Sequence, residues 1–221
     1  AGFTASAYMR GVDFYNIPTT VLSQVDSSIG GKTAVNLDGI KNIVGAFYQP
    51  KKVLIDVNVL KTLPARQIAS GLAESVKMAL TSDEELFELM ETGDAQENIE
   101  IIIERSLRIK KAVVEEDEKE QGLRKILNFG HTIGHGYEST GHGALYHGEA
   151  VALGMLPMVS GEVRERLVPV LEKLGLPVSY KADPDKVFEA VLHDKKASNG
   201  HVSVIRVERP GSFIMEEKNI E

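Results

Sequence analysis

Three histidines and one glutamate have the residue types and spacing of a catalytic metal site. His131 and His135 are four residues apart, so on a helix both side chains project from one face. His147 follows within a few turns of chain, and Glu74 lies on a predicted helix upstream. One carboxylate and two imidazoles would form a three-ligand zinc site with positions open for substrate oxygens. The spacing leaves open whether His131 or His135 is the ligand, and a lone pair of this kind is often structural.

Two lysines occupy positions that suit the binding of an anion. Lys77 lies three residues after Glu74, and this pair is either a solvated helix face or a metal ligand beside a cation for the substrate. Lys110 falls on the apolar stripe of its predicted helix, where it either snorkels or contacts phosphate or carboxylate. The run from Gly31 to Thr33 resembles the end of a Walker A loop, but Asp26 stands where that loop needs glycine. We therefore reject an ATP-binding P-loop.

The composition favours a small-molecule substrate. The 221 residues carry a formal net charge of -7 without a run of Lys and Arg, which argues against nucleic acid or an anionic membrane as partner. No apolar run is long enough to span a bilayer. The absence of cysteine excludes disulfides and thiolate metal ligands, and we expect a cytoplasmic location. Because the first residue is Ala1, we expect the chain to begin inside a longer protein.

Strand and helix signals divide the sequence near residue 63. Apolar runs at 14–20 and 53–57 predict strands. Beyond them, apolar residues recur at helical spacing from Pro64 onward. Further helices are predicted from a capping box of Ser82 and Glu85 to Gly93, over 99–116, 129–138 and 148–163, and over 183–192 with Asp183 as the N-cap. A hairpin of 202–207 and 213–215 follows. We predict an α/β part over residues 1–62 and a mainly α-helical domain over 63–221, packed around a shared cleft.

Several short motifs, taken together and in order, resemble the 3-dehydroquinate synthase family. They are Arg10-Gly11, IPTT at 17–20, QVDSSIGGK at 24–32, Lys41-Asn42, GAFYQP at 45–50, GLAESVK at 71–77, NFGHTIGH at 128–135 and HGEA at 147–150. The resemblance implies that residues 1–62 are the C-terminal part of a Rossmann-like NAD-binding domain. It implies that residues 63–221 bind metal and substrate.

The same resemblance assigns roles to individual residues. It makes Glu74, His131 and His147 the ligands of zinc or cobalt and gives His135 a role in proton transfer. Glu120 matches a proton acceptor, although it reads equally well as a solvated surface acid. The implied contacts of a phosphorylated keto acid substrate are Arg10, Asp26, Lys32, Asn42, Lys77, Lys110, Arg124, Asn128 and Lys196. The implied NAD contacts are Thr19, Thr20, Lys41, Leu60, Lys61, Thr62 and Ser70.

The family's reaction explains why a metal, cations and NAD would share one cleft. It oxidises a substrate hydroxyl with NAD, eliminates phosphate, returns the hydride and closes a ring by an intramolecular aldol step. Family members carry roughly a hundred further residues upstream, including a glycine-rich turn for the pyrophosphate. We therefore expect this chain alone to bind zinc without turnover, and its longer parent to form a homodimer. The alternatives are a related sugar-phosphate cyclase, a metal-dependent polyol dehydrogenase, or an inert metal-binding fragment.

Overall fold

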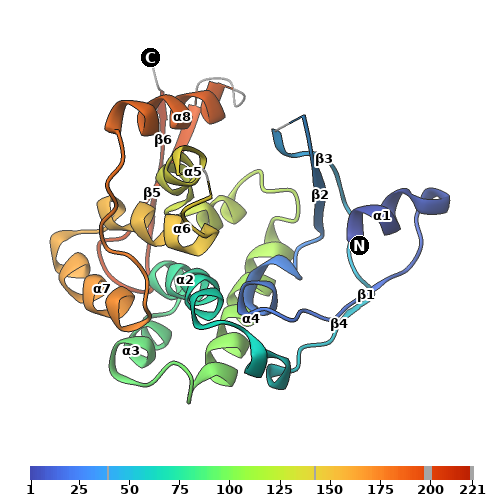
Figure 1. Ribbon diagram of the computed structural model, residues 1–221, viewed down its shortest axis with the longest axis horizontal. Helices are drawn as coiled ribbons and strands as arrows, with labels where there is room; N and C mark the ends of the chain where they lie inside the picture. The colour runs from blue at the N-terminus through green and yellow to red at the C-terminus, as the bar shows by residue number, and fades with distance from the viewer. Residues whose placement is uncertain (39, 142, 197–200, 220–221) are drawn as a thin grey trace.

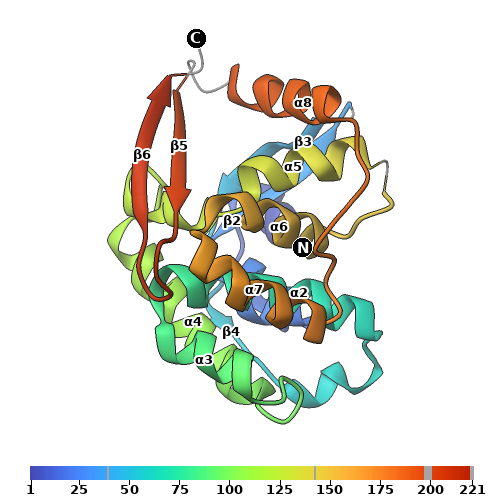
Figure 2. The same cartoon turned by 90° about the vertical axis from the view of Figure 1, so that its left-hand side faces the viewer.

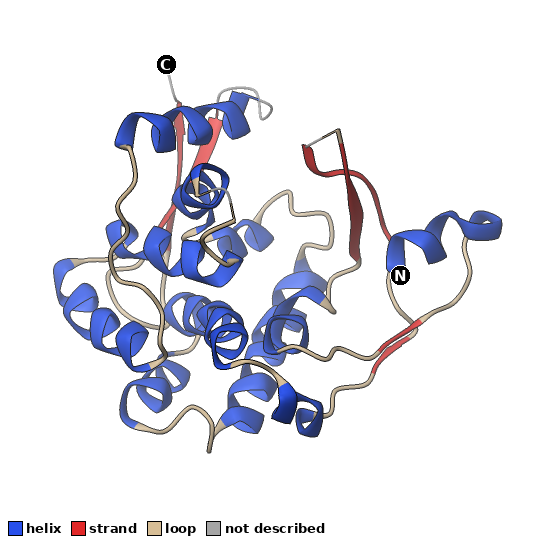
Figure 3. Ribbon diagram, viewed as in Figure 1, coloured by secondary structure: helices blue, strands red, loops and turns tan. Residues whose placement is uncertain are grey.

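The computed structural model describes residues 1–38, 40–141, 143–196 and 201–219, without the side chains of 40, 41, 193–196, 201, 202 and 219. In Figure 1 the N-terminal strands lie to one side of a body of helices. Figure 3 shows that the strands are few and short, and that helices dominate. The structure therefore has the predicted order, a partial α/β part followed by a mainly helical part. Among the described residues, no helix has both the length and the apolarity that crossing a membrane requires.

The N-terminal part contains helix α1 (Gly2–Ala7) and two pairs of strands. Strand β1 (Tyr15–Asn16) runs parallel to β4 (Lys52–Val53), and β2 (Lys32–Leu37) pairs antiparallel with β3 (Ile40–Phe47). The predicted strands at 14–20 and 53–57 are thus only two residues long. Pro18 cannot donate a ladder hydrogen bond after β1. After β4, the Asp56 side chain accepts a hydrogen bond from Asn58 N at 2.8 Å and opens a 3-10 turn over Val57–Thr62.

The second part consists of seven helices and one hairpin among the described residues. The helices are α2 (Ala65–Ser82), α3 (Glu84–Thr92), α4 (Ile99–Glu116), α5 (His131–Thr140), α6 (His147–Met155), α7 (Gly161–Lys173) and α8 (Pro184–Lys196). Strands β5 (His201–Arg206) and β6 (Ile214–Asn219) form the predicted terminal hairpin, which stands at one edge in Figure 2. Helix α4 has the predicted bounds, and α8 begins directly after its predicted N-cap, Asp183.

Helix α2 is the centre of the helical part, because every residue from 69 to 81 is buried. Helices α3, α4 and α6 all contact it. Helices α5 and α6 also approach each other closely, since a Cβ at Gly134 would lie 2.9 Å from the Ala150 carbonyl oxygen. An amphipathic surface helix has one apolar stripe. Helix α2 is instead covered all round from residue 69 to residue 81, so the polar residues of this stretch are held inside the protein.

Several predicted helix boundaries are wrong. The helix predicted over 129–138 is α5, His131–Thr140, and the helix predicted to end at Leu192 continues to Lys196. Ser82 is the last residue of α2, and Asp83 is the N-cap of α3, with its side chain accepting a hydrogen bond from Leu86 N at 3.0 Å. The helix predicted over 148–163 is two helices. Helix α6 ends at Met155, a 3-10 turn containing Pro157 follows, and Ser160 caps α7. Proline removes a backbone donor and the capping serine satisfies a new helix start, so the chain changes direction here.

Candidate metal and anion-binding site

Three elements bring Glu74, His131 and His147 together. Glu74 lies in the middle of α2, while His131 and His147 are the first residues of α5 and α6. The Glu74 Oε1 atom is 3.5 Å from His131 Nε2 and 3.4 Å from His147 Nε2. One ligand atom from each residue lies within 4.8 Å of the other two. These three donors have the chemistry and proximity that a divalent metal ion needs.

The other ring nitrogen of each histidine faces an oxygen. His131 Nδ1 is 3.2 Å from the Phe129 carbonyl oxygen, and His147 Nδ1 is 3.4 Å from Glu138 Oε2. A tautomer with the proton on Nδ1 satisfies these oxygens and leaves each Nε2, which faces Glu74, to donate its lone pair to a metal ion. The orientation of both rings therefore suits metal coordination through Nε2.

The electrostatics of the group also fit a cation. Glu74 is fully buried; burial raises its pKa, but Lys77, His131 and His147 lower it well below the ordinary value. Burial and the Lys77 charge lower the pKa of His131 to about 3. Burial lowers the pKa of His147, but Glu138 and Glu74 raise it more, to about 9. Within the described part of the chain Glu74 Oε1 has no hydrogen-bond partner. An orphaned carboxylate oxygen between two imidazoles is what a metal ion would satisfy, so these residues fit zinc.

His135 lies one helical turn after His131 and is exposed. Its ring centroid is 5.5 Å from that of His131 and 6.1 Å from that of His147. With Glu138 and His147 it forms a second group whose ligand atoms lie within 4.8 Å of one another. His135 is thus beside the buried group but on its solvent side, which is compatible with proton transfer and leaves that role a prediction.

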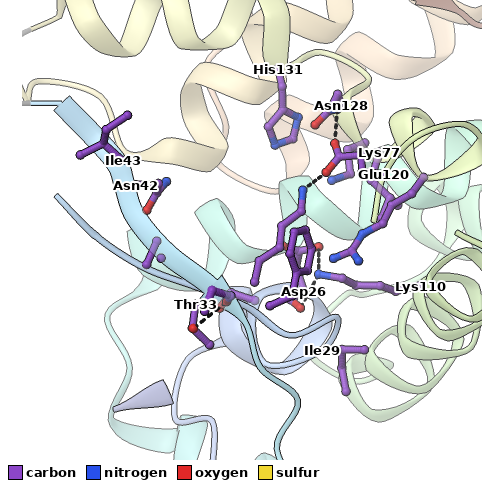
Figure 4. A pocket seen from close by; sticks show the side chains of 18 residues that line it. Asp26, Ile29, Thr33, Asn42, Ile43, Lys77, Lys110, Glu120, Asn128 and His131 are labelled. Atoms are coloured by element: carbon purple, nitrogen blue, oxygen red, sulfur yellow. Dashed lines mark hydrogen bonds and ion pairs between the residues drawn. The ribbon is translucent and has the colours of Figure 1, made fainter. Parts of the chain in front are cut away.

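A cavity of about 690 Å³ lies between the β2–β3 hairpin and the helices, with His131 in its wall (Figure 4). The hairpin contributes uncharged residues, including Thr33, Asn42 and Ile43. The opposite wall contributes most of the cations. The charged residues in the lining are Asp26, Lys32, Lys77, Lys110, Glu120 and Arg124. Four cations against two carboxylates give the cavity a positive excess, which suits a phosphate or a carboxylate.

The cationic side chains are held in place by named partners. Lys110 donates to Asp26 Oδ1 at 2.7 Å and to the Asp26 carbonyl oxygen at 2.5 Å. Arg124, almost fully buried, donates to the carbonyl oxygens of Glu118 at 2.5 Å and Gly30 at 3.0 Å. Burial lowers the pKa of Arg124, and the charges of Asp26, Asp117 and Glu118 only partly oppose that shift. Burial lowers the pKa of Lys110, and the Asp26 carboxylate offsets only part of that shift.

Glu120 is part of a polar chain at the mouth of the cavity rather than a solvated surface acid. It contacts Lys32 and accepts a hydrogen bond from Asn128 Nδ2 at 2.6 Å (Figure 4). Burial, Arg124 and Lys110 lower the pKa of Lys32 to about 8, although the charge of Asp26 opposes that shift. The contacts of Glu120 with Lys32 and Asn128 therefore connect the hairpin to the helical part.

Among the described side chains, the remaining predicted contacts are not part of the lining of this cavity. Arg10 and Thr19 are exposed in the N-terminal part, and Thr20 Oγ1 accepts a hydrogen bond from Ser23 N at 3.2 Å. The residues from Leu60 to Thr62 lie in the 3-10 turn before α2. The Ser70 hydroxyl accepts a hydrogen bond from Gly148 N at 3.0 Å inside the protein. The side chains of Lys41 and Lys196 lie outside the described residues. The nucleotide and substrate roles of these residues remain predictions.

Sequence reasoning named Lys32 and Asn42 as substrate contacts through the family resemblance, but it did not find the β2–β3 hairpin that carries them or the carboxylate of Glu138. The hairpin carries weak strand signals because polar and small residues interrupt it. Glu138 lies three residues after His135, so its position on the same helix face could have been read from the spacing. Its contact with His147, however, depends on how α5 and α6 meet.

Fold and site together define a class of protein. In this class a helical part, beside an α/β part, contains a glutamate–histidine group that could hold a metal ion and a cationic cavity next to it. Both parts match family models. Residues 1–70 match the 3-dehydroquinate synthase N-terminal model, and residues 71–197 match the 3-dehydroquinate synthase C-terminal model. The chain therefore belongs to the 3-dehydroquinate synthase family.

Curated relatives agree with this assignment. The chain is 46% identical to a 3-dehydroquinate synthase of Dehalococcoides mccartyi over 98% of this chain and 65% of the relative. It is 47% identical to a 3-dehydroquinate synthase of Enterococcus faecalis over 96% of this chain and 63% of the relative. The chain thus spans about two thirds or slightly less of the length of these relatives.

Two solved structures share the fold. A 2-epi-5-epi-valiolone synthase from Streptomyces hygroscopicus, with NAD+ and Zn2+ bound, superposes with a TM-score of 0.89 at 29% identity. The match covers 98% of this chain and 65% of that chain. A 2-deoxy-scyllo-inosose synthase complexed with carbaglucose-6-phosphate, NAD+ and Co2+ gives a TM-score of 0.86 at 29% identity, over 99% of this chain and 67% of that one.

Proposed function

We propose that this chain supplies the metal and substrate sites of a 3-dehydroquinate synthase. The reaction would convert 3-deoxy-D-arabino-heptulosonate 7-phosphate into 3-dehydroquinate and phosphate. The observation that carries the proposal is the shared location of two features. His131 belongs both to the buried metal group and to the lining of the cationic cavity. A substrate anion in the cavity would therefore lie next to the metal.

Glu74, His131 and His147 would hold zinc or cobalt. When bound, the ion would polarise a substrate oxygen and favour its loss of a proton. Lys77, buried beside Glu74, would face the same substrate end with a positive charge. Lys110 and Arg124 would bind the phosphate or carboxylate, because the cavity that they line holds four cations against two carboxylates. Asp26 would keep Lys110 pointed into the cavity.

Proton transfer would involve the more exposed groups of the site. His135 would relay a proton between the substrate and solvent, since it is exposed beside the metal group. Glu120 and Asn128 would orient Lys32 against the substrate. NAD would accept and return the hydride. Its contacts would include Thr19, Thr20, Lys41, Ser70 and the turn from Leu60 to Thr62.

Similarity to the two solved synthases supports a site that uses NAD and a divalent metal, but the substrate choice rests on the curated relatives, to which identity is higher. Identity is 46–47% to 3-dehydroquinate synthases and 29% to the other two enzymes. Arg124 adds a physical reason. A buried guanidinium lining the cavity suits a carboxylate-bearing substrate, because it offers planar paired donors.

A chimera tests the proposal, because the chain spans about 65% of its relatives. It would join this chain to the part of the Enterococcus faecalis relative that the chain does not cover. We expect zinc- and NAD-dependent phosphate release from the heptulosonate phosphate, and loss of it in His147→Ala. A chimera that folds and binds zinc but releases phosphate only from another sugar phosphate would assign the site to a related cyclase.

A further inference from the structure

Helices α2 and α6 meet along three successive turns of α2. Arg66, Ser70 and Glu74 follow one another at intervals of four residues, so they share one face of α2. Opposite them are three consecutive residues at the start of α6, taken in reverse order. Arg66 meets Glu149, Ser70 meets Gly148, and Glu74 meets His147. The last of these pairs belongs to the metal group.

Arg66 and Glu149 form the strongest contact of this row. Arg66 donates to both oxygens of Glu149, from Nε at 2.6 Å and from Nη2 at 2.7 Å. Glu149 Oε2 also accepts a hydrogen bond from Tyr146 N at 2.7 Å, and the Arg66 guanidinium lies over the Tyr146 ring at 4.2 Å. Arg66 Nη2 donates further to the Ala144 carbonyl oxygen at 2.6 Å. This network fixes the chain on both sides of His147.

The middle contact sets the distance between the helices. Gly148 N donates to the Ser70 hydroxyl at 3.0 Å, and both residues are buried. A Cβ at Gly148 would collide with the Ser70 carbonyl oxygen. The two backbones are therefore as close as a glycine permits.

We infer that Arg66, Ser70 and Glu149 are positioning residues that hold His147 Nε2 where one ion can bind it together with Glu74. The inference rests on the proposed metal site and concerns only the His147 side of it. His131 is held differently, by the Phe129 carbonyl oxygen and by the turn at Gly130, whose φ is 76°. Bidentate Arg–carboxylate pairs fix geometry as well as adding energy. Metal ligands depend on such supporting partners for affinity.

The test measures zinc affinity in the 221-residue chain, by competition with a chromophoric chelator, for Arg66→Met and for Glu149→Gln. We expect each variant to bind zinc about 10-fold more weakly, the lower end of the effect of losing a supporting partner. Arg66→Lys keeps the charge without the paired donors, so it should fall between Arg66→Met and the unmodified chain. The matched control is Arg108→Met, which breaks an exposed Arg108–Glu104 pair on α4 and should leave zinc affinity unchanged.

Two further readouts separate positioning from general stability. The visible spectrum of bound Co²⁺ reports ligand geometry and should change in Arg66→Met and Glu149→Gln but not in Arg108→Met. Urea unfolding of the metal-free chains measures stability alone. If both variants lose stability yet bind zinc with unchanged affinity and an unchanged cobalt spectrum, the contact is only structural and the inference is overturned. If the unmodified chain binds no zinc, the proposed function fails instead.

Discussion

Replacing Glu74 with glutamine separates the two roles that the structure gives this side chain. Glu74 is 0% exposed and contacts Lys77, which is 2% exposed. Its Oε1 atom also faces both histidine Nε2 atoms. Without metal, the carboxylate compensates the buried lysine. With metal, it would be a ligand. Glu74→Gln keeps the shape of the side chain and removes only the charge.

The stability cost follows from burial of the pair. Removing one partner of a buried ion pair costs about 3–5 kcal/mol, because the other charge stays buried without compensation. The two carboxylates that line the cavity are already engaged, Asp26 by Lys110 and Glu120 by Lys32, so neither replaces Glu74 beside Lys77. Adding Lys77→Met removes the uncompensated charge and keeps a similar volume. The double variant should therefore recover most of the lost free energy of unfolding.

Urea unfolding of the metal-free chain and chelator competition for zinc measure the two roles separately. We expect Glu74→Gln to lose about 3–5 kcal/mol and more than about 100-fold in zinc affinity. The double variant should recover stability but not zinc binding. The reasoning is refuted if the double variant binds zinc like the unmodified chain, or if the single variant loses less than about 1 kcal/mol.

Three other predictions concern the same site. His135→Asn should leave zinc affinity within about threefold while slowing phosphate release by the chimera, and a large loss of zinc would make His135 a ligand. Sulfate has a constant charge between pH 6 and 9, and it should bind more weakly as the pH rises through about 8. The reason is that Lys32 is a cation below its pKa and neutral above it. The same pH dependence in Lys32→Met would exclude Lys32 as the cause. Chelation should lower the free energy of unfolding by about 2.7 kcal/mol relative to zinc at 100 times its dissociation constant, and equal unfolding curves would show that zinc does not bind the folded chain.

Helix periodicity was a reliable guide where one helix face is apolar, and less so elsewhere. Helix α4 matches its predicted bounds because its apolar residues recur at regular spacing and Asp117 ends it in a non-helical conformation. The helix predicted over 148–163 is divided at the turn that contains Pro157. The prediction missed this break because apolar residues continue through the turn. The β2–β3 hairpin was not predicted, because its exposed strands lack regular alternation of apolar and polar residues.

For the site, spacing grouped Glu74 with two of the three histidines but did not choose between His131 and His135, and only the family resemblance named His131. His131 and His135 lie on one face of a helix, so spacing could not choose between them. The structure distinguishes the two histidines by how deeply each side chain is buried. His131 begins α5 against Glu74, while His135 is exposed one turn later. Glu138, Glu149 and Arg66 lie on three helices that meet only in the folded chain. No local sequence pattern predicts that they come together around His147.

Zinc-edge anomalous diffraction from a crystal of the zinc-loaded chain tests the central claim most directly. We predict one strong peak bonded to Glu74 and to the Nε2 atoms of His131 and His147, at roughly 2.0–2.2 Å from each ligand atom. The competing position is the second group, formed by His135, Glu138 and His147. A peak at that group, with none beside Glu74, would contradict the account.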